Sequence, residues 1–183
     1  YVPEHSITTT PIKPYTMATA LTTGASNGIG LELAKIHAAK GDDLVLVARN
    51  KQKLDELKRE LEAAHKVKVY TIGKDLSLPH AAKEVYDETT RQHISIDYLI
   101  NNAGVIPNIG PLSQAEPHNL AMALRVGLEA PMQLCATFLG ATENWSMPRK
   151  VVNISSGLGR RAMASQAAYC AAKAGMDHFT RCL

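Results

Sequence analysis

Five strand-like runs alternate with helix-like runs from Met17 onward, and this alternation constrains the fold more than any other feature of the chain. The run LVLVA, residues 44–48, is continuously apolar, which is typical of a strand in a parallel sheet that is covered on both faces. Strands separated by helices imply right-handed crossovers. The sequence therefore predicts an α/β chain with a Rossmann-type, doubly wound parallel sheet and helices on both faces.

A glycine-rich stretch, TGASNGIG at residues 23–30, follows the first expected strand, residues 18–23. Gly24, Gly28 and Gly30 permit a tight turn and let a pyrophosphate approach the backbone, and the helix that follows offers free N–H groups. A plain turn is the alternative. The position of the stretch between strand and helix favours a dinucleotide-binding loop.

The other elements follow from apolar spacing and turn residues. The helix after the glycine loop carries Ile29, Leu33 and Ile36 on one face and should end before Gly41, and Asn50 should cap the next helix, which has a leucine stripe. Further strands are expected at residues 67–72, 97–101 and 151–155, a weaker helix at about 79–92, and a last helix that carries Tyr169.

A long helix should follow the fourth strand, after a loop that contains Pro107, Gly110 and Pro111. Pro131 lies within this helix and should bend it. One side of the expected helix carries Leu120, Leu124, Gly127, Leu128, Leu134 and Phe138.

Composition excludes several other classes of protein. The 183 residues suit one domain, and the net charge of +3 comes without a block of Lys and Arg, so no nucleic-acid partner is expected. Cys135, Cys170 and Cys182 lack metal-binding spacing, which favours a reducing, cytoplasmic setting and no metal. No apolar run reaches the roughly 18–20 residues of a membrane span, so no membrane partner is expected.

Residues 1–16, YVPEHSITTTPIKPYT, differ from the rest of the chain. They show no apolar periodicity and lack the basic start and apolar run of a secretory signal. They are expected to be a disordered or non-native extension, with a short structured arm as the alternative. Residues 17–183 are expected to form the NAD(P)-binding domain.

Arg49 directly follows the second strand, in the run VLVAR. Dinucleotide-binding folds contact the adenosine ribose at this point: an acid binds the 2′-hydroxyl, whereas an arginine accommodates a 2′-phosphate. A solvated arginine is the alternative. The residue favours NADP(H) over NAD(H).

Two further strand ends carry polar or small residues: Asp75, in the run KDL after the third strand, and NNAG, residues 101–104, after the fourth. Such residues can border an adenine and a ribose. Helix capping and turn formation explain Asp and Asn at such positions equally well.

Tyr169 and Lys173 lie four residues apart on the last helix, and Ser156 ends the fifth strand. A free phenol has a pKa near 10, and a nearby ammonium stabilises the phenolate and lowers that pKa. The phenol can then donate a proton to a carbonyl oxygen, while Ser156 binds the same oxygen. A Tyr-x3-Lys pair alone is usually an exposed helix face, so the combination carries the hypothesis.

Together TGASNGIG, NNAG, NISS and YCAAK, in this order over residues 17–183, resemble the short-chain dehydrogenase/reductase (SDR) family of the classical type. The sequence around YCAAK is similar to that of sepiapterin- and benzil-reductase-like members of the family. The resemblance implies that Tyr169 is the acid–base residue, and that Lys173 adjusts the acidity of Tyr169 and holds the nicotinamide ribose. It also implies that Ser156, rather than Ser155, is the serine that orients the substrate. The cofactor contacts that it implies, together with Arg49, are Gly24, Ser26, Asn27, Gly28, Ile29, Gly30, Asp75, Leu76, Asn101, Ala103, Gly104, Tyr169 and Lys173.

Two departures from the family stand out. Gly127, in the run VGLEAP, occupies the place of an asparagine that completes the family's catalytic tetrad. Family members also continue beyond the equivalent of Leu183 with two more strands, a substrate lid and a nicotinamide-contacting segment. The expectation is a domain that is truncated at its C-terminus, without its last strands.

The expected function is transfer of a hydride between NADPH and a carbonyl or alcohol substrate, with Tyr169 as acid–base residue. A 3-oxoacyl-type or steroid-type member of the family, and a dinucleotide-binding sensor or scaffold without turnover, are the alternatives. The 183-residue chain itself is expected to be inactive, and a full-length form is expected to be a homo-oligomer.

Overall fold

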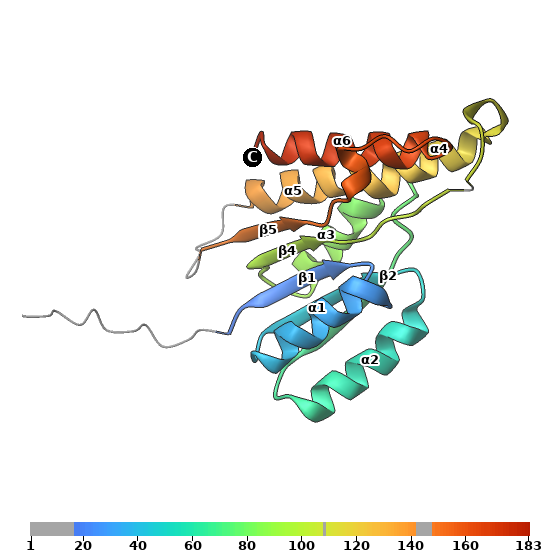
Figure 1. The fold of residues 1–183 in the computed structure, drawn as a ribbon. Coiled ribbons are helices and arrows are strands. Elements are labelled where there is room, and N and C mark those ends of the chain that lie inside the picture. Colours follow the sequence, from blue (N-terminus) through green and yellow to red (C-terminus); the bar gives the residue numbers. More distant parts are fainter. Residues whose placement is uncertain (1–16, 108, 142–147) are drawn as a thin grey trace, which may run out of the picture.

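The computed structural model describes residues 17–107, 109–141 and 148–183, so the expected extension at residues 1–16 lies outside the described residues. One parallel sheet runs through the chain in the order β3-β2-β1-β4-β5 (Figure 1). Its strands are β1 (Thr19–Thr23), β2 (Asp43–Ala48), β3 (Val69–Gly73), β4 (Tyr98–Asn101) and β5 (Lys150–Asn153). The helices are α1 (Gly28–Ala39), α2 (Lys51–Ala64), α3 (Ala81–Arg91), α4 (Pro117–Leu124), α5 (Ala130–Gly140) and α6 (Ala167–Thr180), with short 3-10 helices η1 (Leu112–Gln114) and η3 (Gly157–Gly159) and a π-helical turn η2 (Arg125–Glu129).

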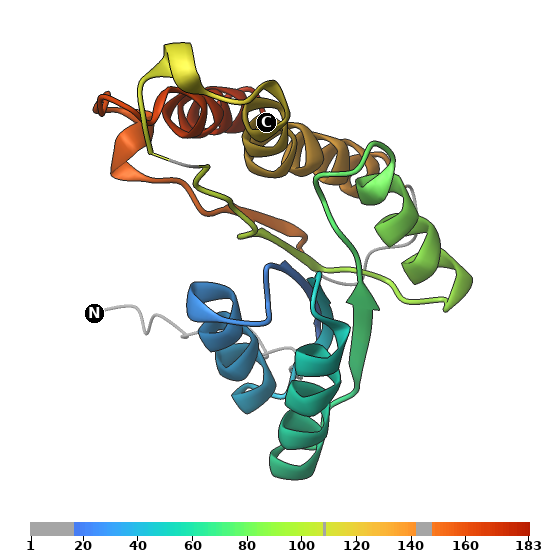
Figure 2. The same cartoon turned by 90° about the vertical axis from the view of Figure 1, so that its right-hand side faces the viewer.

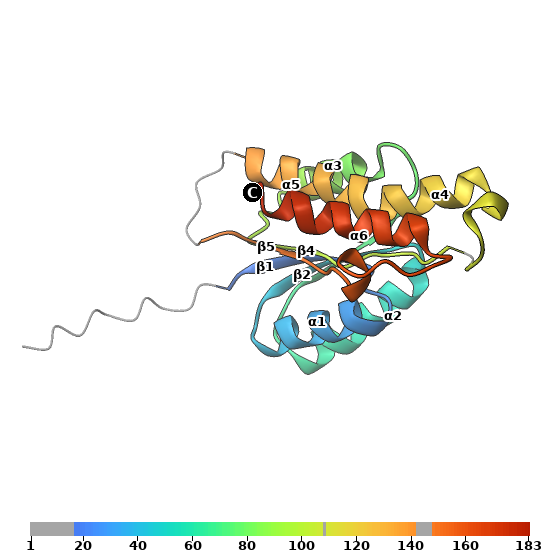
Figure 3. The same ribbon diagram turned by 45° about the horizontal axis from the view of Figure 1, so that its top comes forward.

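The helices cover both faces of the sheet, as the sequence predicts. In Figures 2 and 3, α1 and α2 lie on one face, and α3, α5 and α6 lie on the other. The continuously apolar sequence of β2 is explained by burial of both its faces. Val45 and Val47 join the core beneath α3 and α5, whereas Leu44 and Leu46 join the core beneath α1 and α2. Both faces of this strand are therefore excluded from water.

The strand order reverses between β1 and β4, which are neighbours although they lie far apart in the chain. At such a switch point the loops after the two strands diverge and leave a crevice at the carboxyl edge of the sheet. The glycine loop follows β1 and NNAG follows β4, so the fold brings these two motifs to the same crevice.

Helix α1 packs on the sheet mainly through its small residues; of the three residues expected on the buried face, Leu33 is partly buried against the core and the two isoleucines are exposed. Ile29 and Ile36 are 60% and 49% exposed, whereas Gly30, Ala34 and Ala38 are buried against the sheet. Small residues let the helix backbone lie close to the glycine loop, and larger ones would hold it away. Asn50, in contrast, caps α2 as expected, since its Oδ1 accepts a hydrogen bond of 3.0 Å from the Lys53 N–H.

The long helix expected after β4 is interrupted close to Pro131, where a bend was expected. The π-helical turn η2 lies between α4 and α5 and ends just before Pro131, the second residue of α5. Proline has no N–H to donate to the preceding turn, so the regular hydrogen-bond ladder cannot continue through it. The interruption separates α4, beside the crevice, from α5, over the core.

Candidate active site

The glycine loop adopts a backbone that few other residues could follow. Gly24 and Gly28 have φ of +67° and +55°, in the left-handed region. A Cβ atom at Gly30 would lie 2.5 Å from the carbonyl oxygen of Gly24, so the first turn of α1 touches the end of β1. This close approach requires glycine at residue 30 and leaves the α1 N-terminus open, because the Asn27 side chain makes no capping hydrogen bond.

Asn102 clamps the glycine loop, a role that the sequence did not reveal. Its Nδ2 donates to the carbonyl oxygens of Thr23 at 2.9 Å and Gly24 at 3.3 Å. The backbone N–H groups of Asn102 and Ala103 both donate to the Thr23 hydroxyl at 3.0 Å. The two motifs at the switch point are therefore one hydrogen-bonded unit. The only available signal was that two adjacent asparagines on one strand end must point in different directions.

A cavity of about 320 Å³ lies at the carboxyl ends of β1 to β4. Eight of the residues expected to bind the cofactor line it, together with nine residues that were not expected. The expected residues are Gly24, Ser26, Asn27, Arg49, Asp75, Leu76, Ala103 and Gly104, and the additional ones are Val47, Ala48, Asn50, Lys53, Lys74, Ser77, Val105, Met122 and Val126.

Six other candidate cofactor residues do not line this cavity, and two of them, Tyr169 and Lys173, belong to α6. Gly28, Ile29 and Gly30 belong to the first turn of α1 and are not among the residues that line this cavity. Asn101 is buried with its side chain turned away: Nδ2 donates to Asn153 Oδ1 at 2.8 Å and to Cys135 Sγ at 3.3 Å. The structure thus places Asn101 in the link between β4 and β5, and Asn102 at the loop.

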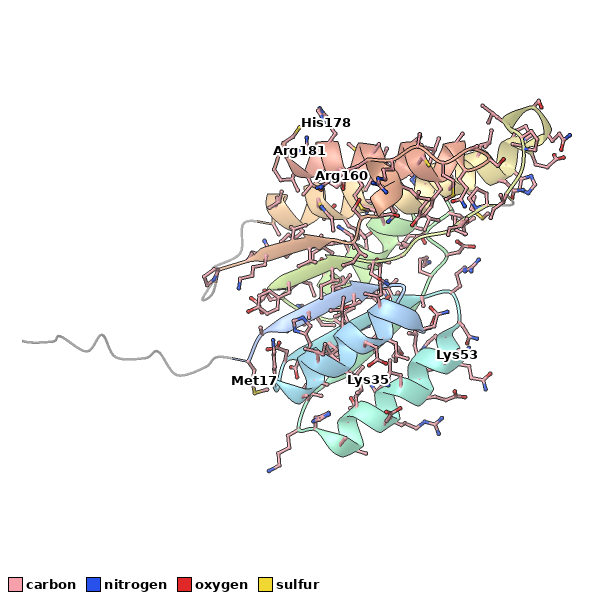
Figure 4. The ribbon with its side chains drawn as sticks, in the orientation of Figure 1. Met17, Lys35, Lys53, Arg160, His178 and Arg181 are labelled. Carbon is pink, nitrogen blue, oxygen red and sulfur yellow. The ribbon has the colours of Figure 1, made fainter. Side chains whose placement is uncertain are left out.

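One end of the cavity is electropositive. Arg49 and Lys53 both line it near the start of α2, and Lys74 lines it from the loop after β3, where it pairs with Glu84 at 2.6 Å. Figure 4 shows Lys53 at the start of α2. Together with the open N-terminus of α1, these groups suit an anionic ligand such as the phosphates of a dinucleotide.

The opposite end of the cavity lies beside the candidate catalytic residues. A Cβ atom at Gly104 would lie 3.8 Å from Lys173 Nζ, and that nitrogen lies 5.8 Å from the centroid of the Tyr169 ring. Lys173 is 3% exposed, and its ammonium donates to the Ile154 carbonyl oxygen at 2.7 Å. The structure therefore brings Tyr169 and Lys173 together and places the Lys173 ammonium beside Gly104 of the NNAG loop.

Ser156 reaches the same region through η3. Its Oγ accepts a hydrogen bond of 3.2 Å from the Leu158 N–H, which leaves the hydroxyl proton available for another oxygen. A Cβ atom at Gly159 would lie 3.0 Å from the Lys173 carbonyl, so η3 lies directly on α6. The serine, the phenol and the ammonium thus belong to two segments in direct contact.

Burial affects the charge of Lys173. Removal from water lowers the pKa of its ammonium below the ordinary value of 10.5, and the negative charge of Asp177 partly opposes this change. An ammonium in this position is a strong source of positive potential, because little water screens it.

Comparison with known proteins identifies the family of the chain. Residues 18–183 match the short chain dehydrogenase family. The chain belongs to this family. It is 30% identical to a benzil reductase ((S)-benzoin forming) of Bacillus cereus over 91% of the chain and 68% of that protein, and 32% identical to a 12alpha-hydroxysteroid dehydrogenase of Clostridium sp. over 86% and 62%.

A solved metagenomic short-chain oxidoreductase in complex with NADP has the same fold, with a TM-score of 0.83 and 33% identity over 90% of the chain and 73% of that structure. The chain thus spans about two thirds of the length of the relatives it matches.

In this short-chain dehydrogenase, Gly127, where the sequence resemblance leads us to expect a departure from the family, is buried in η2. A Cβ atom there would lie 3.0 Å from the Cβ atom of Ala172 on α6, tighter than most contacts between such atoms. The glycine lets η2 lie close to the helix that carries Tyr169 and Lys173.

Within the described residues, no helix is both long and apolar enough to cross a membrane. Nor does that part of the chain bring together three or more His, Cys, Asp or Glu side chains as a metal site would require.

Proposed function

We propose that this short-chain dehydrogenase contributes the cofactor site and the acid–base residues of an NADP(H)-preferring reductase that interconverts a carbonyl and an alcohol. The observation that carries the proposal is the position of Lys173: buried, next to Gly104 of the cavity, and on the helix that bears Tyr169. The NADP complex of the metagenomic relative supports the choice of cofactor.

The residues of the cavity fit a nicotinamide dinucleotide. The α1 N-terminus and Gly24 would hold the pyrophosphate, Asp75 and Leu76 would border the adenine, and Arg49 would bind a 2′-phosphate. When bound, the cofactor supplies the hydride for the carbonyl carbon. The end of the cavity that Ala103 and Gly104 line lies beside Lys173.

Tyr169 donates its phenolic proton to the carbonyl oxygen, and the ammonium of Lys173 stabilises the phenolate that remains. Ser156 donates its hydroxyl proton to the same oxygen in a hydrogen bond and thereby orients the substrate. The reverse direction uses the phenolate as the base. Benzil and related ketones are suitable first substrates, because one relative is a benzil reductase.

We expect turnover to require a chain longer than residues 17–183. The edge strand β5 has Val152 42% exposed, and such edges favour aggregation. We also propose a reducing, cytoplasmic setting, which the three free cysteines support. Membership of the family supports a homo-oligomer.

The experiment compares residues 17–183 with a chain extended through the downstream coding sequence, using NADPH oxidation with a panel of ketones and diketones. In the extended chain, Tyr169→Phe should bind NADPH normally but lose roughly a hundredfold to ten-thousandfold in turnover. Turnover of Tyr169→Phe within a few-fold of the parent would refute the assignment. Cofactor binding without turnover in the extended parent would support a dinucleotide-binding sensor instead.

A further inference from the structure

One face of α6 carries a third ionisable residue beyond the pair already described. Tyr169, Lys173 and Asp177 are spaced by four residues each, so they lie one above the other along the helix. The side chain of Asp177 is 18% exposed. A carboxylate therefore lies one turn beyond a buried ammonium, on the side away from the phenol.

Contacts with η3 hold this carboxylate in place. A Cβ atom at Gly159 would lie 3.0 Å from Asp177 Oδ2 and equally close to the Lys173 carbonyl, so the η3 backbone touches α6 at both residues. Arg160 follows η3, and its Nε lies 3.7 Å from Asp177 Oδ2. Figure 4 shows Arg160 beside α6. The carboxylate of Asp177 thus lies where α6 meets the segment that carries Ser156.

The charges around Lys173 single out Asp177. The elements packed against α6 carry Arg160 after η3, His118 on α4, and Arg125 and Glu129 on η2. Arg125 and Glu129 form their own pair at 3.9 Å and are about half exposed. Asp177 is the acid whose negative charge opposes the effect of burial on the pKa of Lys173.

We propose that Asp177 is a positioning residue of this site, whose carboxylate keeps the buried Lys173 ammonium charged so that it can stabilise the Tyr169 phenolate. The consequence for catalysis rests on the proposed function, whereas the effect on Lys173 does not. Asp177 acts through Lys173 and touches neither the cavity nor the phenol.

The test is an NMR titration of the Lys173 side chain in the 183-residue chain with 13C-labelled lysine, assigned by the signal that Lys173→Met removes. Asp177→Asn keeps the shape of the side chain and removes its charge, and should move the titration of Lys173 to lower pH. Asp177→Ser should move it in the same direction. Glu129→Gln is the matched control, because it breaks an acid–arginine pair of similar length on a neighbouring element, and should leave the titration in place.

A titration of Lys173 that stays in place in Asp177→Asn, or that moves equally in Glu129→Gln, would overturn the proposal. In an active longer chain, Asp177→Asn should also bring the alkaline fall of kcat/KM to lower pH, and an unchanged profile would overturn the positioning role. The NMR titration needs no turnover, so a failure of the proposed function is distinguishable from a failure of this inference.

Discussion

The ammonium of Lys173 donates a hydrogen bond of 2.7 Å to the carbonyl oxygen of Ile154, the residue that follows β5. This bond joins the helix that carries Tyr169 to the strand end that leads to Ser156. It also explains how a lysine remains in an almost dry position, because a buried charge needs hydrogen-bond partners.

The free energy of unfolding should carry a pH-dependent contribution from Lys173. Burial lowers the pKa of Lys173 in the folded chain, so the unfolded chain binds this proton more tightly. Between the lowered pKa and the ordinary value of 10.5, stability therefore rises with pH. Urea unfolding of the parent and Lys173→Met, measured from neutral pH toward 10.5, should give a difference, parent minus variant, that increases with pH. A constant or falling difference would contradict this expectation.

Gly30→Ala should destabilise the fold, because the added methyl group would lie 2.5 Å from a backbone carbonyl that cannot move aside. Overpacking of this kind costs about 1–3 kcal/mol. Gly140→Ala is the control: residue 140 is also helical, and no atom of the described residues beyond its chain neighbours and its own helix backbone lies within 4 Å of an added Cβ atom, so its change should stay within about 0.5 kcal/mol. Equal unfolding free energies for the two variants would show that the close contact at Gly30 is unimportant.

Arg49→Ala should weaken NADPH binding by about tenfold to a hundredfold, the loss expected for a hydrogen bond to a charged group, and should leave NADH binding unchanged. Isothermal titration with both cofactors measures this directly. Arg59→Ala removes an exposed arginine from α2 that does not line the cavity, and serves as the control. A parent chain that binds NADH as well as NADPH would refute the role of Arg49.

Gly127→Asn should destabilise the chain by about 1–3 kcal/mol, because the new side chain meets Ala172 on α6. Ala172→Gly should restore part of that loss in the double variant, as expected for residues in contact. In an active longer chain the rate should change only modestly, since glycine already supplies the backbone carbonyl that an asparagine at this position would supply. An extended parent that is inactive until Asn is introduced would contradict this view.

Much of the fold could be predicted because the signals are local. The apolar run of β2, the glycine loop, the Asn50 cap and the irregularity at Pro131 each depend on residues within a turn or a strand of one another. The alternation of these elements then leaves little choice of architecture, since parallel strands need helical crossovers. The family resemblance rests on the same local motifs.

The face that α1 presents to the sheet could not be predicted from apolar spacing. Ile29, Leu33 and Ile36 suggested one face, but the two isoleucines are exposed and only Leu33 is partly buried. The close approach to the Gly24 carbonyl requires a glycine at residue 30, and Gly30, Ala34 and Ala38 are buried instead. The distance between two backbones decides this choice, and neither sequence segment alone contains that distance.

The site itself was decided by contacts between residues far apart in the chain. NNAG contains two asparagines, and only the pairing of β1 with β4 turns Asn102 toward the glycine loop and Asn101 toward Asn153. Likewise YCAAK places a lysine near a tyrosine, but the packing of α6 against the end of β5 and against η3 buries Lys173 and covers Asp177 with the η3 backbone. The sequence by itself determined which elements form and where the motifs fall, because turns and periodicities are local. The tertiary structure alone decided which side chains meet and how strongly their charges interact, because burial and proximity arise only when distant segments pack together.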